Sequence, residues 1–204
     1  MPGAGQGTIR AARRPDAAAL ADICLRTADS GRDATGLLTD DGLWADLFAL
    51  PYLVLDPGLA FVLDVAGSVQ GYVVGTADSA AFAAAVRRDW LPRVGGRYPP
   101  GPRPTALEEG LVRALHEPER DLLPELAPYP AHLHIDLLPA VQGHGWGRRL
   151  MSTLFAAARD RGAPGVHLGI APDNERALAF YRHLGMQELR LAQGVFLVAP
   201  SDLL

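Results

Sequence analysis

Three glycines at alternate positions follow an apolar, strand-like run in the last third of the chain. The segment Gln142-Gly143-His144-Gly145-Trp146-Gly147 stands after residues 132–138 and before a stretch with helical periodicity. The first turn of a helix leaves backbone amides unpaired and carries a partial positive charge, so a pyrophosphate can bind there without a lysine or a metal. Glycines let the backbone approach such an anion closely. The segment therefore predicts a phosphate-binding loop, to which Arg148 adds a cationic contact.

Two other classes of protein bind phosphates with glycine loops, and the spacing argues against both. A P-loop needs Gly-Lys followed by Ser or Thr, which this segment lacks. A dinucleotide-binding fold carries its glycine motif near its start and builds a whole sheet afterwards, whereas only residues 148–204 follow this loop. A turn that binds no ligand is the remaining alternative.

The elements around the loop must hold it in place. Hydrophobic periodicity predicts the order strand, helix, strand, helix, strand, strand for the last third of the chain. Gly162 and Gly185 are expected to end the two helices, and Asp173 is expected to cap the second one. The expected elements are strands over 132–138, 166–170, 188–192 and 195–198, and helices over 148–161 and 174–184.

The first part of the chain predicts further strands and helices and a long insertion. Asp16 is expected to cap the first helix, and Gly67-Ser68 to form a hairpin turn. Residues 92–104 hold five prolines and three glycines, too many for a regular element. With its flanking helices this stretch forms an insertion at about 79–131, ahead of the fourth strand. The expected elements are strands over 8–10, 61–65 and 69–76, and helices after Asp16, over 43–50 (ending before Pro51), 80–90 and 108–116.

Length and composition describe an ordinary globular chain. Its 204 residues fit a single domain over 1–204, with 49% hydrophobic and 21% charged residues and a formal net charge of -4. No basic cluster resembles a nucleic-acid footprint, and neither a signal peptide nor an apolar run of membrane-spanning length is recognisable. We therefore expect a cytoplasmic protein that binds neither nucleic acid nor membrane. Cys24, the single cysteine, is expected to be buried.

Two motifs at matching separation resemble the signatures of one family. Gln142-x-x-Gly145-x-Gly147, after a strand that ends in Leu-Leu-Pro, is similar to the acetyl-CoA signature of the GNAT acetyltransferase superfamily. The run from Asn174 to Met186 is similar to that superfamily's Asn-x-x-Ala-x-x-Phe-Tyr-x-x-Leu-Gly-Phe, with Met186 in place of the final aromatic residue.

A narrower resemblance covers most of the chain. The runs that start at Phe61, Gly71 and Trp90 resemble the acetyltransferase-like C-terminal domain of O-GlcNAcase and its free-standing bacterial relatives. The eukaryotic domain is thought to have lost the cofactor loop, which this sequence keeps. The resemblance implies the α/β (α+β) GNAT fold: a central, mixed, mostly antiparallel twisted sheet of about seven strands, flanked by helices.

The resemblance also implies acetyl-CoA as the cofactor and CoA as the product. The backbone of Leu137 and Leu138 is expected to pair with the pantetheine arm, and an amide near Leu138 to polarise the thioester carbonyl. The amides of 143–148 are expected to hold the pyrophosphate. The predicted cofactor-binding residues are Leu137, Leu138, Gln142, Gly143, His144, Gly145, Trp146, Gly147, Arg148, Asn174, Ala177 and Tyr181.

Two residues are predicted to carry catalysis. Tyr181 lies two helical turns after Asn174 and is expected to donate a proton to the departing thiolate, with helix packing as the alternative. Alternation along 132–138 places His132, His134 and Asp136 on one face of the strand. Asp136 is the predicted general base, ahead of His134. A structural hydrogen-bonding role is the alternative for both, because buried polar groups are normally satisfied by their neighbours.

The acceptor is the least defined part of the prediction. The polar loop 29–35 lies where GNAT proteins often build the acceptor pocket, so Arg32 and Asp33 are predicted to contact substrate, with a solvated loop as the alternative. The histidines lack metal-ligand spacing, and no metal is predicted. The sequence does not identify the acceptor amine. The closing strands over 188–198 could contribute to a homodimer.

These observations lead to one principal functional hypothesis. It is an N-acetyltransferase that moves the acetyl group of acetyl-CoA to a primary amine, a small molecule or a peptide, by direct attack in a ternary complex. The alternative is a non-catalytic module that binds acyl-CoA or a protein partner.

Overall fold

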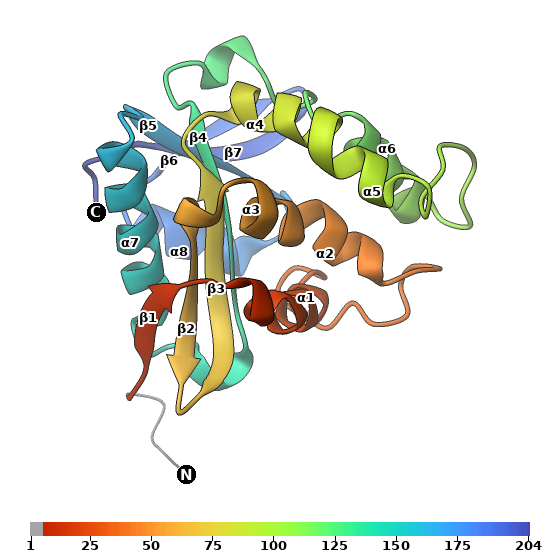
Figure 1. Cartoon of the computed structure of the whole chain (residues 1–204). Helices are drawn as coiled ribbons and strands as arrows, with labels where there is room; N and C mark the ends of the chain where they lie inside the picture. The colour runs from red at the N-terminus through yellow and green to blue at the C-terminus, as the bar shows by residue number, and fades with distance from the viewer. Residues whose placement is uncertain (1–5) are drawn as a thin grey trace.

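A seven-stranded sheet forms the centre of the protein, in the order β1-β2-β3-β4-β5-β7-β6 (Figure 1). The computed structural model describes residues 6–204; residues 1–5, within the stretch where no signal peptide is expected, lie outside the described residues. Neighbouring strands are antiparallel except β4 and β5, which are parallel. The strands are β1 (Thr8–Ala11), β2 (Ala60–Val65), β3 (Ser68–Thr76), β4 (Ala131–Leu137), β5 (Gly165–Ile170), β6 (Gln187–Leu191) and β7 (Gly194–Pro200). The mixed, mostly antiparallel sheet of the GNAT fold is confirmed.

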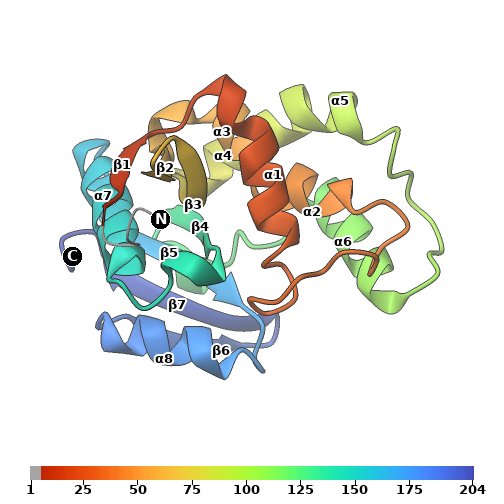
Figure 2. The ribbon, with the colours of Figure 1, turned by 90° about the horizontal axis from the view of Figure 1, so that it is seen from below.

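Helices cover both faces of this sheet (Figure 2). One face packs against α7 and α8, through a core that includes Leu154, Phe155 and Leu178. The other face packs against α1, α2, α3 and the insertion. The helices are α1 (Ala17–Leu25), α2 (Gly42–Phe48), α3 (Leu50–Leu55), α4 (Ser79–Ala85), α5 (Leu91–Val94), α6 (Ala106–His116), α7 (Trp146–Asp160) and α8 (Glu175–His183).

The strand sequences divide their side chains between these two cores. Val62, Tyr72 and Val74 are buried on the α1 side, whereas Leu63 and Val73 are buried on the α7 side. The change of side at each residue follows from the two-residue period of a strand. The same alternation in β4 turns its polar side chains toward the helices of the first half of the chain.

The insertion before β4 is confirmed and is more helical than expected. α4, a π-helical turn over Val86–Trp90 and α5 form one continuous helical run over residues 79–94. Pro92, which has no amide to donate, is the second residue of α5 and comes directly after the π-helical turn. The Trp90 indole donates to the backbone carbonyl of Asp46 at 2.8 Å and so fastens the insertion to α2.

Two of the predicted helix caps are wrong. The Asp16 side chain accepts no hydrogen bond from an α1 amide; it accepts from the Arg10 guanidinium at 2.8 and 2.9 Å and from the Arg13 amide at 2.7 Å. α8 is capped by Asn174, whose side chain accepts from the Ala177 amide at 3.1 Å, and not by Asp173. In both places a neighbouring polar group offers a better-placed partner than the one that the sequence pattern favours.

Two chain reversals also differ from the prediction. The β2–β3 hairpin turns at Ala66-Gly67, with φ angles of 52° and 83°, and Ser68 already belongs to β3. The helix predicted over 43–50 ends at Phe48, before Pro51 as expected, but Pro51 itself lies in the first turn of a further helix, α3, where proline is well tolerated. Cys24 is buried, as expected.

The described residues contain no helix that is both long and apolar enough to cross a membrane.

We predict that Leu154→Ala destabilises the protein by about 2–5 kcal/mol, because it leaves a cavity where α7 packs on the sheet. Leu154 has no exposed surface, whereas Leu107 on α6 is 45% exposed. Leu107→Ala is therefore the matched control, with an expected effect within about 0.5 kcal/mol. Urea unfolding followed by circular dichroism measures both; equal effects would contradict the packing described here.

Candidate active site

β4 and β5 run side by side over a very short distance. Their register contains two pairs, Ala131 with Val166 and His132 with His167. The Leu138 amide donates to the Gln70 carbonyl on the β3 side. Since backbone groups alternate in direction along an antiparallel ladder, the amides of Ile135 and Leu137 point the other way, into the opening toward β5. An extended ligand could pair with these amides as an added strand does.

A groove of about 680 Å³ occupies this opening. It is bounded by the end of α1, by β4, by the glycine loop, by the end of β5 and by α8. Most of the predicted cofactor and catalytic residues lie along it: Asp136, Leu137, Gln142, Gly143, Gly145, Gly147, Arg148, Asn174, Ala177 and Tyr181.

The glycine loop leaves room for an anion at the start of α7. Gly143 and Gly145 have φ angles of 79° and 77°, and a Cβ atom at either would meet nothing within 4 Å. The first backbone bond into α7 runs from the Arg149 amide to the Gly145 carbonyl, so the amides of Gly147 and Arg148 have no acceptor in the helix. These features fit a pyrophosphate.

Gln142 acts as a brace between β4 and α8. Its Nε2 donates to the Leu137 carbonyl at 2.7 Å, and its Oε1 accepts from the Arg176 guanidinium at 2.6 Å. The Gln142 side chain therefore has a structural role within the motif, because it links the glycine loop to β4 and to α8. Arg176 also lines the groove. Sequence reasoning missed it, since it occupies an unspecified position of the second motif.

Three predicted cofactor residues do not line the groove. Leu138 cannot offer its amide to a thioester, because that amide is already donated to Gln70. The Trp146 side chain is 4% exposed and belongs to the core under α7. His144 is exposed and places its Nδ1 2.8 Å from the Gln142 carbonyl.

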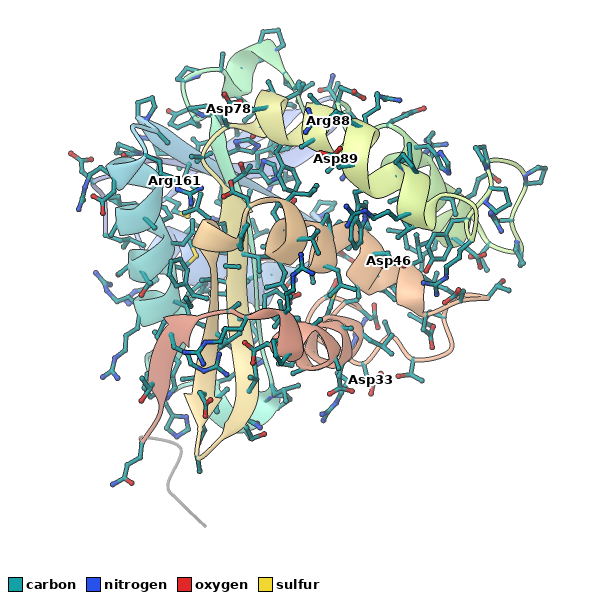
Figure 3. The ribbon with its side chains drawn as sticks, viewed as in Figure 1. Asp33, Asp46, Asp78, Arg88, Asp89 and Arg161 are labelled. Carbon is teal, nitrogen blue, oxygen red and sulfur yellow. The ribbon has the colours of Figure 1, made fainter. Side chains whose placement is uncertain are left out.

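The two predicted substrate residues also lie outside the groove. Arg32 is exposed and forms an ion pair with Asp29 at 3.0 Å. Asp33 is exposed as well and accepts from both the amide and the hydroxyl of Thr35; Figure 3 shows it at the outer edge of the loop after α1. The part of this loop that lines the groove is Ser30 and Gly31.

Asp136 and Tyr181 share the groove and differ in chemistry. The Asp136 carboxylate accepts a 2.5 Å hydrogen bond from the Tyr72 hydroxyl, and burial raises its pKa above the ordinary value, which makes it a stronger base. Burial, and then the Asp136 charge, raise the pKa of Tyr181, so its phenol stays protonated at neutral pH. Burial raises the pKa of Cys24 to about 12, so it stays a thiol.

The two β4 histidines belong to a partly buried hydrogen-bonded chain. The Tyr52 hydroxyl lies 2.8 Å from His132 Nε2 and 3.1 Å from His134 Nε2, and the Ser79 hydroxyl lies 2.6 Å from His132 Nδ1. Burial lowers the pKa of His134 to about 3 and that of His132 well below its ordinary value, so both rings are neutral. Tyr52 and Ser79 were not identified from the sequence.

Comparison with known proteins identifies this arrangement. The model of the Acetyltransferase (GNAT) family matches residues 38–186. The chain belongs to this family. This GNAT acetyltransferase is 47% identical to the protein in the crystal structure of SsHAT, with a TM-score of 0.91 over 97% of this chain and 99% of that one.

The O-GlcNAcase resemblance is confirmed as well. The GNAT chain is 28% identical to the rat protein O-GlcNAcase over 193 residues, which are 92% of this chain and 21% of that protein. It therefore spans about a fifth of the length of that relative. The structure of yncA from Salmonella typhimurium with acetyl-CoA shares the fold, at 20% identity and a TM-score of 0.55 over 96% of this chain and 94% of that one.

We predict that acid destabilises the protein through the two partly buried histidines of β4. The folded-state pKa of His134 is about 3, below the unfolded value near 6.5, so the unfolded state binds more protons as the pH falls through 6.5. The expected loss between pH 7.5 and 5.5 is about 1 kcal/mol for each such histidine. Urea unfolding across this range measures it.

His134→Asn should reduce this pH dependence, because the titrating ring is gone. The same substitution at exposed His144, outside the chain of buried rings, is the control. A pH dependence that His134→Asn leaves intact would contradict the burial of a neutral imidazole at that position.

Proposed function

We propose that this GNAT protein is an N-acetyltransferase that moves the acetyl group of acetyl-CoA to a primary amine by direct attack. The observation that carries the proposal is the groove itself, in which outward-facing β4 amides, the open glycine loop, Asp136 and Tyr181 lie together. Membership of the family, and the solved relative with acetyl-CoA, support the cofactor.

The groove fits the two chemically distinct ends of acetyl-CoA. The amides of Gly147 and Arg148 would hold the pyrophosphate at the positive end of α7. The amides of Ile135 and Leu137 would pair with the pantetheine arm, a role that the sequence assigned to Leu137 and Leu138. When bound, the cofactor supplies an acetyl group activated as a thioester.

The residues of the groove meet the proton requirements of the transfer. The amine nitrogen bonds to the acetyl carbon and the carbon–sulfur bond breaks, while the amine loses one proton and the departing thiolate gains one. Asp136 is the base for the first proton, and Tyr181 donates the second. An outward-facing β4 amide stabilises the charge on the carbonyl oxygen, an effect typically worth about 3–4 kcal/mol for one such donor. The products are the acetamide and CoA.

The alternative of a non-catalytic acyl-CoA-binding or protein-interaction module has a different signature. Such a module binds acetyl-CoA and releases no CoA with any amine. The presence of both a partly buried carboxylate and a buried phenol in one groove favours the enzyme.

Gly145→Val tests the cofactor site. We expect acetyl-CoA binding, measured by isothermal titration calorimetry, to weaken at least about tenfold, because a branched side chain strains a left-handed residue and fills the anion site. Gly162→Val is the matched control: Gly162 has a φ angle of 81°, an equally open Cβ position and a place outside the groove. Unchanged binding in Gly145→Val would refute the assignment of the loop.

Tyr181→Phe tests the proton donor. It keeps the ring and removes the hydroxyl, so we expect kcat to fall by about 10²–10⁴ while the Kd for acetyl-CoA changes little. Release of CoA, followed with a thiol reagent, measures kcat. An unchanged kcat would show that Tyr181 only packs, whereas parallel losses of binding and thermal stability would indicate misfolding instead.

A further inference from the structure

A second pocket, of about 270 Å³, adjoins the groove on the side of the insertion. Phe48, Leu133, His134 and the end of β5 over residues 168–171 line both spaces. The pocket therefore adjoins the groove across these shared residues, and His134 lies between the two spaces. An acceptor bound there would reach the acetyl group without crossing the pyrophosphate site.

The walls of this pocket are largely aromatic and aliphatic, with Ser79, Arg120 and three histidines among the polar lining residues. They include Phe48, Tyr52, Phe82, Val86, Trp90, Leu115 and Phe196. Two aspartates also contribute, and both already have partners: Asp46 binds Arg97 and Tyr98, and Asp121 forms an ion pair with Arg120. The described lining thus offers no row of carboxylates for several ammonium groups, and its desolvating walls favour an amine in the neutral, nucleophilic form.

The hydrogen-bonded chain in the wall has a fixed direction. The Ser79 hydroxyl donates its hydrogen to the Pro130 carbonyl at 2.7 Å, because a carbonyl can only accept. The neutral His132 ring must then donate from Nδ1 to Ser79 and accept from the Tyr52 hydroxyl at Nε2. Tyr52 has no second hydrogen, so His134 donates to it from Nε2.

This direction of the hydrogen-bonded chain leaves a free hydrogen-bond acceptor on His134, between the pocket and the groove. Since the His134 ring is neutral and its hydrogen is on Nε2, Nδ1 carries a lone pair. Nδ1 has no hydrogen-bond partner among residues 6–204. His134 lines both the pocket and the groove, so an incoming N–H group can supply the missing partner.

We propose that the pocket binds the acceptor, a small primary monoamine with an aromatic or aliphatic body, and that His134 Nδ1 accepts a hydrogen bond from its nitrogen. The inference rests on the acetyltransferase activity proposed above and adds the substrate class. His134 is a substrate-positioning residue here, while Asp136 remains the base. Polyamines, amino sugars and lysine side chains in peptides are the competing acceptors.

The first test compares four amines on the wild-type protein saturated with acetyl-CoA: 2-phenylethylamine, spermidine, glucosamine and a short lysine peptide. We expect the highest kcat/KM for 2-phenylethylamine, by about tenfold or more. Calorimetric titration of the CoA-saturated protein with each amine gives a readout that does not depend on turnover. A preference for any of the other three amines would overturn the assignment.

The second test fills the pocket from α6. Ala114 lines the pocket and not the groove, so Ala114→Phe should lower kcat/KM for 2-phenylethylamine at least about tenfold and leave the Kd for acetyl-CoA unchanged. Ala84→Phe, at an exposed position on α4 outside both spaces, is the matched control. Equal activity of the two variants would overturn the assignment of the pocket.

The third test separates the two nitrogens of His134. His134→Gln places a polar group near the Nε2 position, which preserves a partner for Tyr52, and removes the Nδ1 acceptor. His134→Asn does the reverse. We expect the KM for the amine to rise about tenfold in His134→Gln, with a smaller change in kcat, and to rise less in His134→Asn. The opposite order would show a purely structural role through Tyr52.

Failure of this inference is distinguishable from failure of the proposed function. If acetyl-CoA does not bind, the acetyltransferase proposal and the acceptor pocket fall together. If acetyl-CoA binds and another amine is acetylated, only the acceptor pocket is overturned.

Discussion

The short pairing of β4 with β5 is the constraint on which the rest of the groove depends. Parallel neighbours need a crossover connection, and here that connection is the glycine loop followed by α7. The loop therefore begins at the carboxyl end of β4, beside the opening. Because the two strands pair over only two residues, the β4 backbone beyond them faces that opening with hydrogen-bonding groups that β5 does not use. One feature of the sheet thus creates both the anion site and the extended edge.

The sequence predicted this region well because its signals are local. The glycine spacing, the strand before it and the helix after it all lie within residues 131–160, and the structure keeps their order. The Leu138 amide was misassigned for a non-local reason. Which amides of β4 face β5 depends on its register with β3, and the paired residues, from Thr76 with His132 to Gly71 with Leu137, are 56 to 66 positions apart in the sequence. No pattern within β4 reveals it.

The polar face of β4 also depends on non-local contacts that the sequence pattern does not reveal. Alternation predicts that His132, His134 and Asp136 share a face, and they do. Their partners are Tyr52, Ser79 and Tyr72, which come from three different elements and are brought together only by packing. The prediction that Arg32 and Asp33 contact substrate is unsupported for a different reason. Polar residues there satisfy one another at the surface, so a polar composition alone could not distinguish a ligand contact from a solvated turn.

The division of lining residues between the two spaces separates chemistry from specificity. None of the described residues that line the groove lies in the insertion over 79–131, whereas the adjoining pocket is lined by residues of α4, its π-helical continuation and α6. Ser79 links the two parts, since it starts α4 and binds His132 on β4. A change in the insertion can therefore reshape the acceptor pocket while the cofactor groove keeps its geometry. A change that displaces Ser79 disturbs both, because the direction of the chain that ends at His134 is set at its hydroxyl.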